Sequence, residues 1–192
     1  AVVHVVLSYR DRDKQLLLFF LPRKYRLRGV TMSDGFFPAY SPIFDIFTQG
    51  SLDGKATGTC YQSTTFDNMT IRAADVRIMV RLGLNGVTSA GGRLDLHLAT
   101  GHHLGSSALT DSLATTTASG TAVYNIRYST HIHTIDLPAS SSPFVSWEAS
   151  LLDLVGSMPP IWALILCNLS GAPFISGASN RVTGMFVNYG YA

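Results

Sequence analysis

"VRIMVRLGLNGVTSAGGRLDLHL", residues 76–98, alternates apolar and polar side chains twice, with a glycine-rich interruption between the two runs. A period of two places the apolar side chains on one face of an extended chain, whereas a helix of about 3.6 residues per turn would scatter them. The apolar face comprises Val76, Ile78, Val80, Leu82 and Leu84, then Leu94, Leu96 and Leu98. The opposite face comprises Arg77, Met79, Arg81 and Gly83, then Arg93, Asp95 and His97. The stretch therefore predicts two β-strands, each with one buried face, joined by a loop that contains Asn85-Gly86 and Gly92.

The remaining segments favour the same class of structure. Further extended segments rich in β-branched or aromatic residues are predicted at 2–9, 15–22, 121–129, 131–137, 161–169 and 181–191. Small polar residues at 110–120 and 138–143 are typical of loops at the end of a sandwich. Short helices are predicted at Pro42–Phe47 and at 146–156, the second with Ser146 as N-cap. The spacing predicts an all-β fold, a single antiparallel β-sandwich that occupies residues 1–192.

The composition is unusually poor in charge. Charged residues make up 14% of the 192 residues, compared with about 25% in an average domain. Since no apolar run is long enough to span a bilayer, the simplest explanation is extensive contact with other subunits.

Targeting and redox signals are weak. Cys60 and Cys167 lie far apart in the sequence, form no disulfide framework and favour a reducing compartment. The apolar run Leu16–Leu21 is too short for a signal-peptide core and is followed by "RKYRLR" in place of a cleavage site. A first residue of Ala fits methionine removal or excision from a precursor. The sequons at Asn68 and Asn168 are interpreted as chance.

Basic residues are concentrated near the start of the chain. Half of the 14 lysines and arginines fall between Arg10 and Arg28. Arg23, Lys24, Arg26 and Arg28 are candidates for contact with RNA phosphates, with Tyr25 available to stack on an unpaired base. The alternative is a solvated strand end or a salt-bridge patch between subunits.

The histidines do not form a recognisable catalytic or metal site. His131 and His133 are predicted to point to one side of a strand, and His102-His103 lies beside a glycine, but no acidic partner or complete ligand set accompanies them in the sequence. Asp136 lies close to His133 in sequence, yet the alternation of faces argues against a His–Asp dyad. No nucleophile elbow, P-loop or dinucleotide motif is present. The sequence therefore predicts no metal, no cofactor and no catalytic residues, and favours surface histidines or pH-sensitive subunit contacts.

An aromatic segment follows the basic one. Phe36, Phe37, Tyr40, Phe44 and Phe47 are interrupted by Pro38 and Pro42. They are candidates for a subunit interface, as an arm that grips a neighbour, and the alternative is that they form an apolar belt in the core.

Several of these segments together resemble a known family. "IRAADVRIMVRLGLNGVTSAGGRLDLHLATG", "TAVYNIRYS", "PPIWALILCNLSG" and the terminal "RVTGMFVNYGYA" are similar to the later strands of picorna-like viral coat proteins. The nearest resemblance is to the small coat proteins of plant viruses in the secovirus family, of the cheravirus type. It covers residues 70–192 and rests on strand order, loop character and the tryptophan-containing penultimate strand. Residues 1–45 match no pattern of that family.

This resemblance implies an eight-stranded jelly roll of the viral capsid type with one or two short helices, in which residues 1–14 form an N-terminal arm or an interface strand. It also implies release from a polyprotein and assembly with other viral coat proteins, in the host cytoplasm, into an icosahedral virion around genomic single-stranded RNA, without a membrane. The alternative is a cellular β-sandwich binding module, lectin-like or trimeric cytokine-like. A hydrolase on a β scaffold would require His133 or His103 to meet a nucleophile in a pocket.

Overall fold

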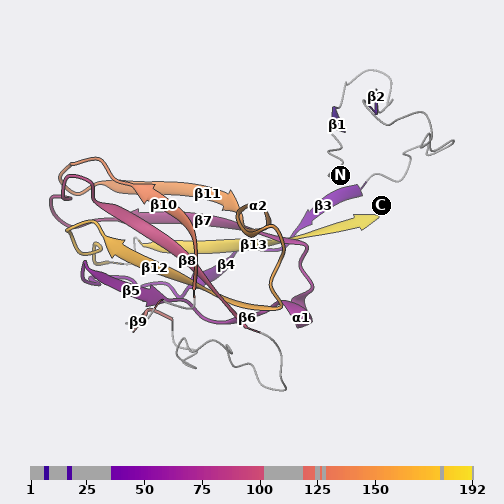
Figure 1. Cartoon of the computed structure of the whole chain (residues 1–192), viewed down its shortest axis with the longest axis horizontal. Coiled ribbons are helices and arrows are strands. Elements are labelled where there is room, and N and C mark those ends of the chain that lie inside the picture. Colours follow the sequence, from indigo (N-terminus) through magenta and orange to yellow (C-terminus); the bar gives the residue numbers. More distant parts are fainter. Residues whose placement is uncertain are drawn as a thin grey trace. The chain divides into compact units, whose positions relative to one another are not determined.

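The computed structural model describes residues 7–8, 17–18, 36–101, 119–123, 126, 129–177 and 180–191 (Figure 1). The chain divides into two compact units, one formed by Pro38–Asn188 and the other by Ala1–Phe37 with Tyr189–Ala192. In the smaller unit, β1 (Leu7–Ser8) pairs antiparallel with β2 (Leu17–Leu18). These two short strands fall within the extended segments predicted at 2–9 and 15–22. The prediction of a single domain with an arm at residues 1–14 stays a prediction.

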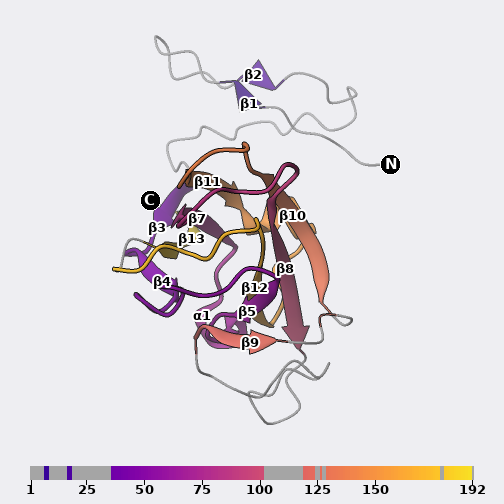
Figure 2. The ribbon, with the colours of Figure 1, turned by 90° about the vertical axis from the view of Figure 1, so that its left-hand side faces the viewer.

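The larger unit is built from two antiparallel sheets that face each other (Figure 2). The first sheet has the order β11-β7-β13-β3, with β4 also paired to β13. Its strands are β3 (Phe36–Tyr40), β4 (Phe44–Phe47), β7 (Asp75–Gly83), β11 (Phe144–Ser150) and β13 (Arg181–Tyr191). The second sheet has the order β10-β8-β12-β5-β9, with β6 also paired to β12. Its strands are β5 (Thr59–Gln62), β6 (Phe66–Asp67), β8 (Arg93–Gly101), β9 (Thr121–Val123), β10 (Thr130–Asp136) and β12 (Ile161–Leu169).

The alternation that predicted β7 and β8 is confirmed. The even-numbered residues from Val76 to Leu82 and from Leu94 to Leu98 are buried in the main core, whereas Arg81 and Arg93 are exposed. The core lies between the two sheets, and β12 contributes Trp162, Leu164 and Leu166 to it. The antiparallel β-sandwich predicted from the sequence is therefore the observed class of fold.

Both helix predictions need correction. Residues 44–47 form the strand β4 because they pair with β13, and a register shift beside Val182 allows the consecutive residues Ile46 and Phe47 both to be buried. The predicted helix at 146–156 begins only at Leu151, because pairing of β11 with β7 keeps the chain extended through Ser150.

The N-cap of this helix is Ser150 in place of Ser146. Helix α2 (Leu151–Val155) starts where the Ser150 hydroxyl accepts a hydrogen bond from the Asp153 amide. It ends at Gly156, whose φ of 77° is the left-handed conformation that glycine adopts most readily. A second, unpredicted turn of helix, α1 (Asn68–Ile71), is capped by Asp67.

The connections at one end of the sandwich are joined by backbone hydrogen bonds. The Ser89 amide donates to the Ser170 carbonyl, the Thr88 amide to the Ser140 carbonyl and the Phe174 amide to the Lys55 carbonyl. Four connections that are distant in sequence, around residues 48–58, 84–92, 137–143 and 170–180, are thus tied together. Helices α1 and α2 lie at the other end (Figure 1).

Candidate interaction surfaces

The aromatic segment is divided between the surface and the core. Phe47 is 2% exposed and belongs to the main core, and the half-buried Phe44 stacks on Phe186 with ring centroids 4.2 Å apart. Tyr40, by contrast, is 56% exposed. Phe36 and Phe37 lie in β3, and their side chains fall outside the described part of the structure. The core alternative therefore holds for Phe47, while Tyr40 presents its ring to solvent as an interface residue would.

Arg23, Lys24, Arg26 and Arg28 lie outside the described residues. Their proposed contact with RNA stays a prediction from the sequence.

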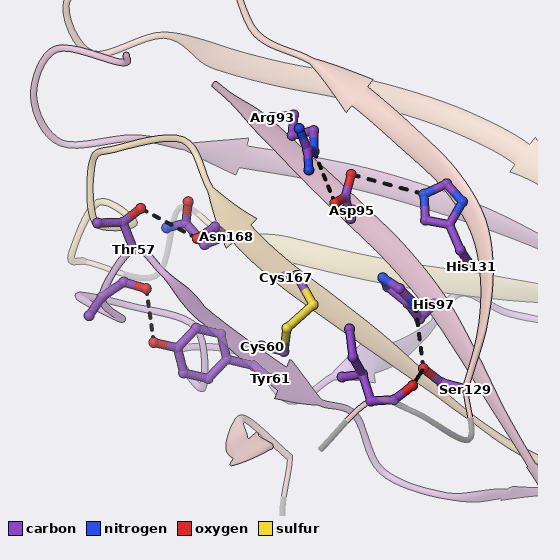
Figure 3. Close-up of a disulfide and its surroundings, with 12 residues drawn as sticks. Thr57, Cys60, Tyr61, Arg93, Asp95, His97, Ser129, His131, Cys167 and Asn168 are labelled. Atoms are coloured by element: carbon purple, nitrogen blue, oxygen red, sulfur yellow. Dashed lines mark hydrogen bonds and ion pairs between the residues drawn. A yellow bond between two sulfur atoms is a disulfide. The ribbon is translucent and has the colours of Figure 1, made fainter. Parts of the chain in front are cut away.

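A polar cluster lies on the outer face of the second sheet (Figure 3). The Asp95 carboxylate accepts hydrogen bonds from Arg93 Nε at 3.1 Å and from the Thr134 hydroxyl at 2.8 Å. His131 Nε2 lies 3.9 Å from Asp95 Oδ1, and the rings of His131 and His97 meet edge-on with centroids 5.1 Å apart. Strands β8 and β10 bring this cluster together, because their pairing sets Thr134 opposite Asp95 and His131 opposite His97. His131 thus has an acidic partner that sequence proximity did not reveal.

The surroundings of this cluster lower the pKa values of Asp95 and His97. Burial opposes ionisation of Asp95, but the hydrogen bonds from Thr134 and Arg93 and the nearby positive charge outweigh it and hold the pKa of Asp95 below its ordinary value. Burial, followed by the proximity of His131, lowers the pKa of His97, while Asp95 opposes that shift. Both groups therefore titrate at a lower pH in the folded chain than they would in a free peptide.

His131 and His133 do not share a face. The register of β10 shifts at Ile132, so that His131 lies opposite His97 and His133 lies opposite the inward-facing Leu96. His133 turns between the sheets and stacks on Trp147 with centroids 4.6 Å apart. The prediction that both histidines point to one side was wrong because a bulge breaks the alternation. His102 and His103 lie outside the described residues.

The two cysteines form a disulfide, contrary to expectation (Figure 3). Cys60 of β5 and Cys167 of β12 are directly paired across the second sheet, which brings together residues separated by 107 positions. The bond lies in a second apolar cluster with Val123, Ile165 and Ile161. The prediction of no disulfide framework was wrong because it rested on distance in the sequence, and the pairing of β5 with β12 brings the two cysteines together.

The two sequons differ in accessibility. Asn168 is fully buried, and its amide group donates to the Ala172 carbonyl and accepts from the Ser170 amide. Asn68 is half-buried and closes the turn after α1 through hydrogen bonds with the backbone of Ala73. Asn168 is thus closed to glycosylation in the folded chain.

The outer face of the first sheet carries arginines in two different states. Arg77 pairs with Glu148 of β11 at 2.8 Å, and this hydrogen bond and charge raise the pKa of Arg77. Arg81 lies directly opposite Arg181 of β13, both side chains are exposed, and neither forms an ion pair or hydrogen bond with another residue that the structure describes. The alternation of side chains predicts Arg81 on a polar face, whereas its position opposite Arg181 follows from the order of strands in the sheet.

Exposed apolar residues lie near the tied loops. Phe144, at the start of β11, is 66% exposed, and Val87, in the connection between β7 and β8, is 71% exposed. Phe144 also lies opposite Gly83, which is two residues along β7 from Arg81. This end of the sandwich therefore presents apolar surface on a framework held by backbone hydrogen bonds.

Comparison with known proteins finds no family model that matches this chain and no match among the curated proteins. Across the part of the chain that the structure describes, no group of three or more His, Cys, Asp or Glu side chains is placed to hold a metal ion. None of the helices among the described residues has the length and apolar character needed to cross a bilayer.

Proposed function

We propose that this chain is a jelly-roll coat protein that assembles with companion coat proteins into an icosahedral shell around single-stranded RNA. The observation that carries the proposal is the nested order of strand pairing. Strand β8 pairs with β10, β7 with β11, β12 with β5 and β6, and β13 with β3 and β4. Each of these pairings encloses the previous one in sequence, an order that supports one long hairpin folded over into two sheets, while the pairing of β9 with β5 lies outside this nesting. A jelly roll is a double-sheet structure of eight strands, and it recurs in viral capsid and lectin domains.

The surface properties support assembly. Charged residues are few, at 14% of the sequence, and removing charges from water is costly unless they are paired. The exposed apolar side chains Val87 and Tyr40 would be shielded from water in contacts between subunits. A closed shell multiplies weak contacts, because each subunit is held by several neighbours at once.

Sedimentation velocity on chain purified natively from its source tests the proposal. A coat protein is expected to sediment as particles far larger than the 20.7 kDa subunit, with nucleic acid absorbance in the same boundary and companion chains of similar fold in the same fraction. A chain that sediments at its own mass at every concentration, without companions, would contradict the proposal.

A specific observation favours the second candidate, a cellular β-sandwich binding module of the lectin-like or trimeric cytokine-like kind. The Cys60–Cys167 disulfide is a feature that persists mainly in oxidising compartments such as the secretory pathway. Because the fold alone does not fix function, the two candidates are separated by association state. A small fixed oligomer, carrying a glycan at Asn68, is the outcome that the second candidate predicts.

A further inference from the structure

We infer that the outer face of the first sheet holds a site for single-stranded RNA, formed by Arg81, Arg181, Ser146 and Phe144 and called here the arginine–phenylalanine patch. Phosphate binds between the two guanidinium groups, and a base stacks on the phenyl ring. The choice of RNA over another single-stranded nucleic acid rests on the proposed function. The patch itself is derived from strand register, exposure and charge.

The two arginines of the patch repel each other. Arg81 and Arg181 are directly opposite residues on neighbouring antiparallel strands, a position in which like charges destabilise the sheet. Arg77 lies on the same face of β7, four residues from Arg81, and its charge is neutralised by Glu148 at 2.8 Å. Arg81 and Arg181 have no such carboxylate partner among the described residues. A bound anion would remove the repulsion, and guanidinium groups bind phosphate through paired hydrogen bonds.

The serine extends the same row. Ser146 of β11 is exposed and lies directly opposite Arg81 on the side away from Arg181. Three neighbouring strands therefore place two cationic groups and one hydroxyl side by side, with strands about 4.8 Å apart. Hydroxyl and guanidinium groups together are the usual donors to phosphate and sugar oxygens.

The phenyl ring of Phe144 lies beside the row of Ser146, Arg81 and Arg181, two residues along β11 from Ser146. Phe144 lies opposite Gly83, and a Cβ atom at Gly83 would come within 2.9 Å of Phe144 Cε1 and 2.8 Å of Ile175 Cγ2. The absence of a side chain at Gly83 thus allows the ring to lie over the strand. The backbone beneath it is fixed, because the Gly83 amide donates to Asn180 Oδ1 and the Gly83 carbonyl accepts from the Ile175 amide. With 66% of the residue exposed, the ring is available as a stacking platform.

The spacing of the rows suits a nucleotide. Phe144 and Ser146 are two residues apart on one strand, a separation of about 7 Å. Phosphates can then lie along the arginine row while an unpaired base reaches the ring. An acidic peptide would use the arginines but has no group that requires the exposed aromatic ring. Asp45, opposite Thr183 on the same sheet, forms no ion pair with either arginine among the described residues and opposes anion binding.

Fluorescence anisotropy with a labelled single-stranded oligouridine, measured on the full chain across a salt series, tests the patch. Each phosphate that is no longer neutralised reduces the slope of log K against log salt by about 0.7 for a single strand, so R81Q/R181Q, which removes both guanidinium groups from one phosphate, is expected to reduce it by about 0.7. F144A is expected to weaken binding by roughly 5- to 150-fold and leave the slope unchanged. D45N is expected to strengthen binding, which no loss of folding could mimic.

The matched control is K55Q/R72Q, which removes the same net charge from residues outside the patch. An equal loss of slope in K55Q/R72Q would mean that net charge alone attracts RNA, and it would overturn the inference. Binding of polyglutamate as tightly as oligouridine, or unchanged RNA binding in both R81Q/R181Q and F144A, would also overturn it. Failure here is distinct from failure of the proposed function, since particles can form without this patch and the patch can bind RNA without particles.

Discussion

Breaking the Cys60–Cys167 bond should lower the stability of the chain substantially. The bond closes a loop spanning a sequence separation of 107 residues. In the chain-entropy description, a loop of roughly 100 residues restricts the unfolded chain enough to stabilise the fold by about 4.7 kcal/mol, and typical measured values are about 2–4 kcal/mol. For a chain of this size each kcal/mol shifts Tm by about 2–4 °C, so reduction should lower Tm by roughly 5–20 °C.

The assay is thermal unfolding followed by circular dichroism, with and without a thiol-free phosphine reductant. The matched control is C60A/C167A, which should melt near the reduced wild type and should not respond to the reductant. Mass spectrometry after alkylation of the unfolded, unreduced protein should find no free thiol. Two alkylated cysteines, or a wild-type Tm that the reductant does not change, would refute the reasoning.

Three further outcomes are expected. Leu96→Ala should lower the free energy of unfolding in urea by about 2–5 kcal/mol, because the Leu96 side chain is fully buried. As a control, Val87→Ala at an exposed position should change it by less than about 0.5 kcal/mol. Equal effects of the two substitutions would contradict the assignment of the core. Gly83→Ala should destabilise the chain by roughly 1–3 kcal/mol in the same assay, because the added Cβ would lie within 2.8 Å of a neighbouring side chain; an unchanged midpoint would show that the site is not crowded. The lowered pKa values of Asp95 and His97 mean that the unfolded chain binds more protons, so their contribution to stability is present at high pH and is lost as pH falls. For His97 the loss should begin below about pH 6.5, and His97→Gln should flatten the change in unfolding free energy between pH 7 and 5; an equal slope in the variant would count against the shift.

The alternation in residues 76–98 predicted two strands and their buried faces correctly because that information is local. In a strand, side chains two residues apart lie on the same face, so a short stretch of sequence is enough to assign the buried face. The same reasoning failed at residues 146–150, where the pattern suited a helix but pairing of β11 with β7 kept the chain extended. It failed again at Ile132, since a single extra residue reverses the face of everything that follows.

The contacts that make up the candidate surfaces are mostly non-local. Strand β5 was not predicted at all, and Cys60 meets Cys167 only because β5 lies beside β12. The same holds for Arg81 and Arg181. The alternation within each strand puts each arginine on a polar face, but the two lie opposite each other only because β13 pairs with β7. Sequence patterns gave the faces of strands, whereas sheet order decided which faces meet.

Electron microscopy of the natively purified chain is the decisive measurement for assembly into a shell. Closed spherical particles that contain the chain are expected, with density for a two-sheet sandwich packed against its neighbours. A preparation of folded, monodisperse single chains at high concentration, with no closed particles, would contradict it.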